Sequence, residues 1–405
     1  MIQNKKYKLA VVASHPIQYQ SPLWRRIAAH PEIDLMVYYC LDWGVSDKSH
    51  SRFFGVKYKW DVPLLEGYNF KFLRNYSPNP GPFLGGFANP GIFWELWKNK
   101  YDAVLVLGWM DITFWFAFIA AKIKGTPVLL RTVNSLSYDK AVKRPGLLLF
   151  FKKIYLKTLF HKFVSAFLAI GTWNRNMYLH YGIPPERIFH FPYGVNNEFF
   201  FEEIKKYEDK QLDIRKELGI GPKTKVITYA ARFVEEKHPE HVVRAYEKIK
   251  SLPDTVVFMV GDGPMKSELE REAKEKGLDG IKFLGFKNQK ELVRIYAVTD
   301  IFVRADSPHK GDWGATVNEA MACGLPVICT DTISSQADLI RRGENGFVYR
   351  LGDLDALAEF IKKLVIDSKF LESMKKKSIE IISNWDYKQD IDELVKALKF
   401  IKKKS

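Results

Sequence analysis

The chain has 405 residues, of which 47% are hydrophobic, so it is long enough to bury two sizeable cores. Its three cysteines are too few for a disulfide framework, and a reducing compartment is the expected setting. The longest apolar stretch, residues 112–123, is shorter than the roughly 20 residues that a membrane-spanning helix needs. The first residues lead directly into an apolar run, so we expect no signal peptide. The nine histidines are scattered, and we predict no metal site.

The net charge of +15 is concentrated in the first half of the chain. Residues 1–195 hold 25 Lys and Arg against 11 Asp and Glu, whereas the remaining residues hold 37 against 36. Eight of the ten tryptophans also lie in the first half. A basic, aromatic-rich half indicates a part of the protein that meets an anionic or an apolar surface, with incidental surface charge as the alternative.

Strand and helix signals alternate through the first 196 residues. The expected strands are residues 7–13, 33–39, 103–107, 127–131 and 164–170. The expected helices are residues 25–30, 112–122 and a segment that runs from Gly171 to about His180. Residues 42–100, rich in aromatic residues, glycine and proline, are interpreted as an insertion that shapes a binding site. The alternation, which continues in the second half, predicts an α/β fold with two doubly wound parallel sheets.

Residues 140–185 contain no Asp or Glu. Their cations are Lys140, Lys143, Arg144, Lys152, Lys153, Lys157, Lys162 and Arg175. Residues 146–160 should be helical, with apolar side chains over most of the circumference and lysines between them. We interpret this helix as lying in a membrane interface, where its lysines reach anionic headgroups. The alternative is a helix that packs against the sheet.

In the second half, residues 197–222 read as a polar linker that contains a short helix at 212–218. The expected strands that follow are residues 225–231, 255–260, 281–284, 300–304, 327–329 and 347–349. The expected helices are residues 264–272, 290–298, 335–341, 353–365, 370–383 and 385–403. Ligands of such sheets bind beyond the carboxyl ends of the strands, which directs attention to the loops there.

One strand–loop–helix–strand unit stands out at residues 300–329. A short helix should begin near residues 313–315 and end at Cys323, because Gly324 fits the position after a helix and Pro326 prevents its continuation. The free N–H groups at such a helix start form an anion site. Glu319 lies just over one turn inside the helix, where a carboxylate can accept hydrogen bonds from sugar hydroxyls. A solvated helix glutamate is the alternative.

The run Glu319-Ala-Met-Ala-Cys-Gly-Leu-Pro-Val327 resembles the motif of the retaining glycosyltransferases of family 4. These have the GT-B fold, in which two doubly wound Rossmann-like domains face a central cleft. The family places another glutamate eight residues before the second one, but this chain has Gly311 there, followed by Asp312. The resemblance implies that Glu319 holds the ribose of a nucleotide-sugar donor. Asp312 then takes the place of the missing glutamate, or the sugar is recognised differently.

The resemblance also assigns further donor contacts. It implies that Arg232 and Lys237, which would otherwise read as surface charges, clamp the donor diphosphate. The expected donor-binding residues near the nucleotide and the helix start are Gly261, Gly263, Phe286, Lys287, Asp312, Trp313, Gly314, Ala315 and Thr316. Polar residues at strand ends in the first half are the acceptor-side candidates: His15, Arg131, Asn134, Ser135 and Asn174.

The implied organisation is an acceptor-binding domain over residues 1–196, the linker 197–222 and a donor-binding domain over residues 223–384. A final helix over residues 385–405 is expected to cross back to the first domain. The expected function is metal-independent, configuration-retaining sugar transfer from a nucleoside-diphosphate sugar, without a cofactor. The expected acceptor is a glycan or a polyprenyl-diphosphate-linked glycan of bacterial cell-surface synthesis.

The expected location is the cytoplasm, peripheral on the anionic inner face of the plasma membrane, and no nucleic-acid partner is expected. Two alternatives stay open. The first is another GT-B reaction, such as that of a nucleotide-sugar epimerase or a phosphorylase. The second is a non-catalytic basic protein that binds membranes or nucleic acid.

Overall fold

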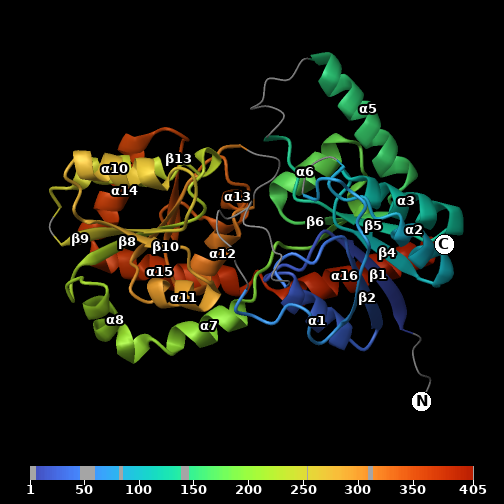
Figure 1. The fold of residues 1–405 in the computed structure, drawn as a ribbon, viewed down its shortest axis with the longest axis horizontal. Coiled ribbons are helices and arrows are strands. Elements are labelled where there is room, and N and C mark those ends of the chain that lie inside the picture. Colours follow the sequence, from blue (N-terminus) through green and yellow to red (C-terminus); the bar gives the residue numbers. More distant parts are fainter. Residues whose placement is uncertain are drawn as a thin grey trace. The chain divides into compact units, whose positions relative to one another are not determined.

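The computed structural model describes residues 6–45, 60–81, 85–137, 146–252, 254–308 and 313–404. Of residue 404, only the backbone is described. The described chain divides into two units, each built on a parallel sheet (Figure 1). The first unit contains the described residues up to 45, the described residues from 62 to 193, and residues 387–404. The second unit contains residues 60–61 and the described residues from 194 to 386.

The sheet of the first unit has seven parallel strands in the order β3-β2-β1-β4-β5-β6-β7. The strands are β1 (Tyr7–Ala13), β2 (Ile33–Tyr39), β3 (Asn69–Phe72), β4 (Ala103–Val106), β5 (Val128–Arg131), β6 (Ala166–Ala169) and β7 (Ile188–His190). The central strands β4, β5 and β6 are buried along their whole length. Strands covered on both faces need continuous apolar runs, which is why their sequences do not alternate.

Helices cover both faces of this sheet. They are α1 (Ser21–Ala29), α2 (Gly91–Lys98), α3 (Ile112–Lys124), α5 (Gly146–Lys162), α6 (Thr172–His180) and α16 (Tyr387–Lys404). One apolar cluster joins one face to α2, α3, α5 and α6, and a second joins the other face to α1 and α16. The last helix of the chain therefore packs in the first unit.

The segment 42–100 departs from its interpretation as an insertion, because it contributes β3 and α2 to the first unit. Strand β3 extends the sheet beside β2, with Lys71 opposite Tyr38. Its four residues alternate between exposed and half-buried, as expected of an edge strand. So short a half-buried run gives little periodic signal, which explains why the sequence did not reveal it.

The sheet of the second unit has six parallel strands in the order β10-β9-β8-β11-β12-β13. They are β8 (Lys225–Ala230), β9 (Thr255–Val260), β10 (Ile281–Gly285), β11 (Ile301–Arg304), β12 (Val327–Thr330) and β13 (Gly346–Tyr349). Its main helices are α7 (Asn197–Lys205), α8 (Gln211–Glu217), α9 (Glu240–Ile249), α10 (Lys266–Glu275), α11 (Gln289–Tyr296), α12 (Ala315–Ala322), α13 (Gln336–Leu339), α14 (Leu354–Ile366) and α15 (Ser368–Ser383). The prediction of two doubly wound parallel sheets is confirmed.

The segment expected to be a linker with one helix contains two helices, α7 and α8. The side chain of Asn197 donates to the backbone oxygens of Ile382 and Trp385 at 2.9 and 3.1 Å. Phe200 is fully buried. These contacts anchor α7 within the second unit.

No helix among the described residues combines the length and the apolar character needed to cross a membrane.

Candidate functional site

The strand order of the second sheet reverses between β8 and β11, which lie side by side and parallel. Doubly wound sheets bind their ligands beyond the carboxyl ends of the strands at such a point. Arg232 follows β8, and Asp306 follows β11. The loops after these two strands, with the start of α12, therefore form the candidate site of the second unit.

Three buried charges converge at this reversal. The Nζ of Lys237 lies 2.6 Å from Oδ1 of Asp306, and the Nε of Arg304 lies 2.8 Å from Oδ2 of the same carboxylate. Arg304 also donates through Nη1 to the backbone oxygen of Ala230 at 3.2 Å. The exposed fractions are 8% for Lys237, 5% for Arg304 and 0% for Asp306. Buried charges are tolerated only when paired and hydrogen-bonded, and this triad meets both conditions while keeping one net positive charge.

The electrostatic surroundings of Lys237 set its protonation. Burial and the charge of Arg304 lower the pKa of its ammonium to about 8, although Asp306 acts in the opposite direction. Arg232 is close enough for its charge to lower the same pKa. The two cations expected from the sequence therefore lie within electrostatic reach of each other, and Lys237 is mainly charged at neutral pH.

The turn that carries Lys237 is fixed from several sides. The Tyr229 hydroxyl donates to the backbone oxygen of Lys237 at 2.5 Å. The backbone N–H of Ser307 donates to the oxygen of Glu236 at 2.8 Å, and the Ser307 hydroxyl lies 2.6 Å from Nε2 of His238. These bonds tie the loop after β8 to the loop after β11. The ammonium of Lys237 is thus held in place before any ligand arrives.

Glu319 lies in α12 and is only 5% exposed. Burial raises the pKa of its carboxyl to about 8, and the opposing charge of Arg304 only partly offsets this. The carboxyl is therefore mostly protonated at neutral pH in the ligand-free protein. A protonated carboxyl can donate as well as accept a hydrogen bond, which suits it to a hydroxyl-rich partner.

The start of α12 has unfilled hydrogen-bonding capacity. Gly314 precedes the helix in a left-handed conformation with φ of 76°. The N–H groups of Ala315 and Thr316 belong to the first turn, which lacks acceptors within the helix. Among the described residues, the buried hydroxyl of Thr316 also has no hydrogen-bond partner. A ligand with acceptor oxygens at this position would satisfy these donors.

Trp313 was predicted to contact the donor, but its side chain packs inside the unit. It is 2% exposed, and its ring stacks on that of Trp385 with centroids 5.6 Å apart. Its Nε1 donates to Oδ1 of Asn318 at 2.8 Å. The indole therefore orders the approach to α12 rather than presenting a binding face. Gly311 and Asp312, where the chain departs from the resembled motif, lie outside the described residues.

The glycines after β9 allow two loops to touch. A Cβ atom at Gly261 would lie 1.9 Å from the backbone oxygen of Ala231, and one at Gly263 would lie 2.5 Å from that of Phe233. The N–H of Phe233 in turn donates to the oxygen of Asp262 at 2.9 Å. These glycines therefore support the backbone beside Arg232.

Phe286 and Lys287, predicted to lie near the base, follow β10 at the same edge of the second sheet. Both are half-buried. The Nζ of Lys287 lies 3.6 Å from a carboxylate oxygen of Glu291, one helical turn away. The backbone oxygen of Gly285 accepts from the N–H of Gly261 at 2.9 Å, which links this loop to the one after β9.

In the first unit, Asn174 joins two strand-end loops. Its Nδ2 donates to the backbone oxygen of Asn134 at 2.7 Å, while its Oδ1 accepts from the N–H of Ile170 at 3.2 Å. Trp109, after β4, donates through Nε1 to Oδ1 of Asn134 at 3.0 Å. The predicted Asn134 and Asn174 are thus brought together at the carboxyl ends of β5 and β6. Trp109 was missed because a lone tryptophan after a strand carries no distinctive spacing.

Arg131, Ser135 and His15 occupy the same edge of the first sheet. Arg131 is 5% exposed, and its guanidinium carbon lies 5.1 Å from the ring centre of Tyr193. Ser135 is buried, and its hydroxyl lies 2.5 Å from that of Ser137. Burial lowers the pKa of His15 to about 4, so its imidazole is neutral at pH 7.

The structure brings together one cluster of residues of the kinds that bind metals. The sequence did not predict it, because the histidines looked scattered. The ligand atoms of His238, Glu240 and His241 lie within 4.8 Å of one another. The two imidazoles stack at an interplanar angle of 30°, which directs their in-plane lone pairs side by side rather than to one point. His238 Nδ1 lies 3.0 Å from Oε1 of Glu240, and His241 Nδ1 lies 3.1 Å from the hydroxyl of Tyr349. The arrangement fits a hydrogen-bonded network better than a metal centre.

Arg304 and Asp306 are the functional candidates that the sequence did not suggest. The segment 300–304 was interpreted only as an apolar strand. A charged residue at the end of such a strand, followed two residues later by the opposite charge, was the available signal.

Comparisons with known proteins give independent information on the second unit. Residues 210–381 match the family described as "Glycosyl transferases group 1". The chain is 27% identical over 184 residues to N-acetyl-alpha-D-glucosaminyl L-malate synthase of Bacillus anthracis, a match that covers 45% of this chain and 47% of that protein. The chain thus spans about half the length of that relative.

Two further similarities cover more of the chain. It is 26% identical over 308 residues to the UDP-Gal:alpha-D-GlcNAc-diphosphoundecaprenol alpha-1,3-galactosyltransferase of Escherichia coli, covering 73% of this chain and 75% of that one. The structure resembles that of Anabaena HepE in complex with UDP, with a TM-score of 0.73 and 17% identity. That match covers 97% of this chain and 99% of HepE.

Proposed function

We propose that this chain, a group 1 glycosyltransferase with the GT-B fold, transfers a sugar from a nucleoside-diphosphate sugar to a glycan or lipid-linked glycan. The observation that carries the proposal is the fixed ammonium of Lys237 at the strand-order reversal of the second sheet. Arg232 adds a second cation there, and the start of α12 adds free N–H groups. Together they suit a diphosphate.

The proposed reaction breaks the bond between the anomeric carbon of the sugar and the diphosphate oxygen. The sugar then carries an oxocarbenium-like positive charge, while negative charge develops on the leaving diphosphate. Lys237, Arg232 and the N–H groups of Ala315 and Thr316 stabilise that negative charge. Because these groups are positioned beforehand, they need little reorganisation during the reaction. Glu319 orients the donor through its ribose hydroxyls.

We further propose that the sugar keeps its anomeric configuration and that no metal ion is needed. The cations of the site can neutralise the diphosphate without one. The acceptor hydroxyl then replaces the diphosphate on the same face of the sugar, and its proton passes to the leaving phosphate oxygen. The similarity to the UDP-Gal:alpha-D-GlcNAc-diphosphoundecaprenol galactosyltransferase and to HepE in complex with UDP supports a nucleotide-sugar donor and a diphosphate-linked lipid as the acceptor class.

The proposal is tested by thermal-shift screening with UDP-, GDP-, ADP- and dTDP-sugars, followed by assays with the sugar that stabilises most. Transfer requires that nucleoside diphosphate is released when an acceptor is present, and NMR of the product then reports the anomeric configuration. Conversion of the donor without an acceptor would instead favour an epimerase. Phosphate-dependent breakdown of a glycan would favour a phosphorylase.

A second proposal concerns location, and the observation behind it is the exposed half of α5. Leu156, Leu159 and Phe160 at its carboxyl-terminal end are buried in the core of the first unit. Large apolar side chains nearer its start are exposed: Leu147, Leu148, Phe150, Phe151 and Ile154. One end of α5 thus packs on the unit, as the alternative interpretation expected, and the other end projects apolar groups outward. The membrane interpretation of the helix stays a prediction.

We propose that the exposed half of α5 docks on an anionic membrane surface, which places the enzyme peripherally on the inner face of the plasma membrane. Aromatic residues and lysines together suit the interface between headgroups and acyl chains. Phe150→Ser with Phe151→Ser should reduce vesicle binding in a flotation assay. Unchanged binding of this variant would remove α5 as the anchor.

A further inference from the structure

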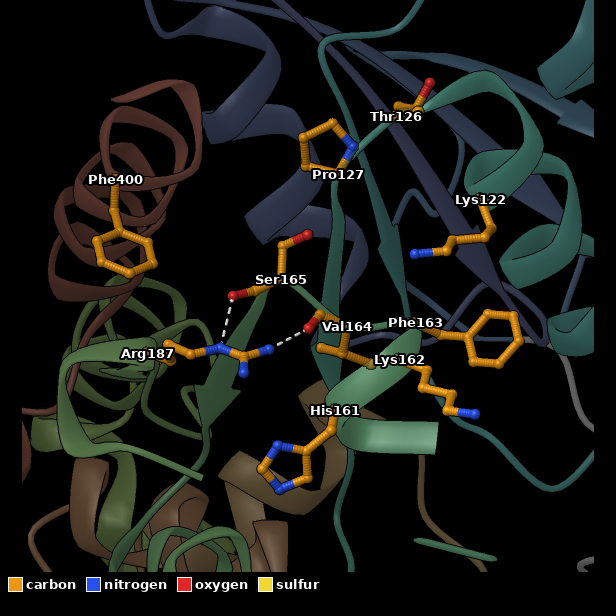
Figure 2. Close-up of a pocket in the computed structure, with 11 residues that line it drawn as sticks. Lys122, Thr126, Pro127, His161, Lys162, Phe163, Val164, Ser165, Arg187 and Phe400 are labelled. Carbon is orange, nitrogen blue, oxygen red and sulfur yellow. Dashed lines mark hydrogen bonds between the residues drawn. The ribbon is translucent and has the colours of Figure 1, made fainter. Parts of the chain in front are cut away.

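A pocket of about 450 Å³ lies in the first unit at the edge opposite to the candidate acceptor residues. It is bordered by the turns that precede β5 and β6, so it lies at the amino ends of these strands (Figure 2). Acceptor and donor ligands of doubly wound sheets bind at the carboxyl ends instead. This pocket is therefore separate from the candidate site described above.

The pocket lining is basic. Lys122 of α3, Lys162 and His161 of α5, and Arg187 border it, and no Asp or Glu is among its lining residues. Among the described residues, neither Lys122 nor Lys162 forms an ion pair. Figure 2 shows Lys122 and Arg187 extending toward the turn at Val164 from opposite sides. Unpaired cations around one hollow favour an anionic occupant.

Arg187 is anchored in a way that leaves part of it available. Its Nε donates to the backbone oxygen of Ser165 at 3.1 Å, and its Nη2 donates to that of Val164. Its guanidinium carbon lies 5.6 Å from the ring centre of Phe167. Among the described residues its Nη1 has no partner. A guanidinium fixed in this way can offer its remaining N–H groups to a phosphate with little loss of freedom.

Exposed apolar side chains lie on the same helix as Lys122. Ile123, next to Lys122 in the chain, is 60% exposed, and Ile119 one turn earlier is 40% exposed. The ammonium of Lys124 donates to the backbone oxygen of Trp97 at 2.6 Å. This bond holds the end of α2, with its exposed Trp97 ring, against the end of α3. A free phosphate ion gains nothing from contact with apolar side chains. A phospholipid has both a phosphate and acyl chains that can contact them.

We propose that this pocket binds the headgroup phosphate of an anionic phospholipid, so that the first unit recognises membrane lipids away from its acceptor site. The inference rests on the proposed attachment of the enzyme to an anionic membrane, whichever element anchors it. The pocket lies where α5 ends, so a surface that receives the exposed half of the helix can also present headgroups to these cations. The pocket adds lipid selectivity to the apolar anchor.

The test measures binding of the full chain to vesicles of phosphatidylcholine alone and of phosphatidylcholine mixed with phosphatidylglycerol. Lys122→Ala with Lys162→Ala should weaken binding to the mixed vesicles about thirtyfold, because each lysine near an anionic surface contributes about 1 kcal/mol. Binding to phosphatidylcholine alone should not change. The charge-matched control is Lys250→Ala with Lys274→Ala, two exposed lysines of the second unit, and it should lose much less.

Equal losses in the pocket variant and the control variant would overturn the proposal, since the effect would then follow net charge. Full competition by inorganic phosphate at the concentration of lipid phosphate would overturn the lipid as occupant. The Phe150→Ser and Phe151→Ser variant separates this inference from the anchor. If that variant binds as wild type while the pocket variant loses selectivity, the α5 proposal fails and the pocket stands.

Discussion

The carboxyl edges of the two sheets are built from different chemistry. In the second unit, buried charges meet there, with Asp306 between Lys237 and Arg304 and the buried Glu319 nearby. In the first unit, Arg131 is a buried cation, but the other predicted residues at this edge contribute neutral amides, hydroxyls and rings, as in the bonds of Asn174 and Asn134. A leaving diphosphate needs positive charge fixed in advance, whereas an acceptor sugar needs hydrogen bonds. The contrast supports the proposal that the second unit serves the donor and the first unit the acceptor.

The largest expected effect comes from removing the central cation. Lys237→Ala should lower kcat/KM by about 100- to 1,000-fold, the range for losing one preorganised group that stabilises transition-state charge. Circular dichroism would verify the fold. Lys274→Ala is the control, because that lysine is exposed on α10 and has no proposed role in the site, and it should change the rate little. Near-normal rates in both Lys237→Ala and Arg232→Ala would refute the clamp.

The next effect sharpens the role of the two residues that hold Lys237. Its pKa of about 8 predicts that kcat/KM falls as the pH rises through 8. Arg304 lowers this pKa and Asp306 raises it. Arg304→Met should therefore move the alkaline limb to higher pH, and Asp306→Asn should move it to lower pH, each by about one unit. If both variants moved the alkaline limb in the same direction, or if neither moved it, Arg304 and Asp306 would not set the pKa of Lys237.

A smaller effect concerns stability and Glu319. Its folded-state pKa of about 8 exceeds the ordinary glutamate value of 4.5, so the folded protein binds more protons between these pH values. The stability of the ligand-free protein should therefore fall as the pH rises from about 4.5 to 8, by an amount on the order of a few kcal/mol. Denaturant unfolding of Glu319→Gln should show a flatter pH profile, whereas the exposed control Glu359→Gln should keep the wild-type slope. An unchanged slope in Glu319→Gln would show that this carboxyl does not titrate as described.

The smallest effect lies in the first unit. Asn174→Ala should raise the acceptor KM severalfold and leave the donor KM unchanged, because it releases the loop that carries Asn134. A stability loss of about 1–3 kcal/mol is expected from the unpaired groups left behind. Asn176→Ala, an exposed residue of the same helix, is the matched control. A change in the donor KM would contradict the proposal that this edge of the first sheet serves the acceptor alone.

The sequence was sufficient for what depends on local pattern. Apolar runs located β1, β2 and β9 at their observed bounds, and Gly324 with Pro326 marked the end of α12. It missed β3, because a short half-exposed edge strand leaves little periodic trace. Family resemblance supplied Arg232 and Lys237, which pattern alone would have left as surface charges.

What the sequence could not give depends on three-dimensional proximity. The pairing of Lys237 with Asp306 joins residues 69 positions apart, and no local rule predicts which carboxylate meets which ammonium. The burial of Trp313 depends on Trp385, which is equally remote. The proximity of His238 to His241 could have been predicted from the sequence, because both lie at the start of α9.

The central claim is that the second unit holds a diphosphate between Lys237, Arg232 and the start of α12. Calorimetric titration of the wild type and Lys237→Ala with UDP, GDP and ADP, and with the matching monophosphates, tests it most directly. For the preferred base, the account predicts that the wild type binds the diphosphate more than about tenfold tighter than the monophosphate, and that Lys237→Ala loses most of this preference. Equal affinity for both nucleotides, or a preference that survives in Lys237→Ala, would contradict it.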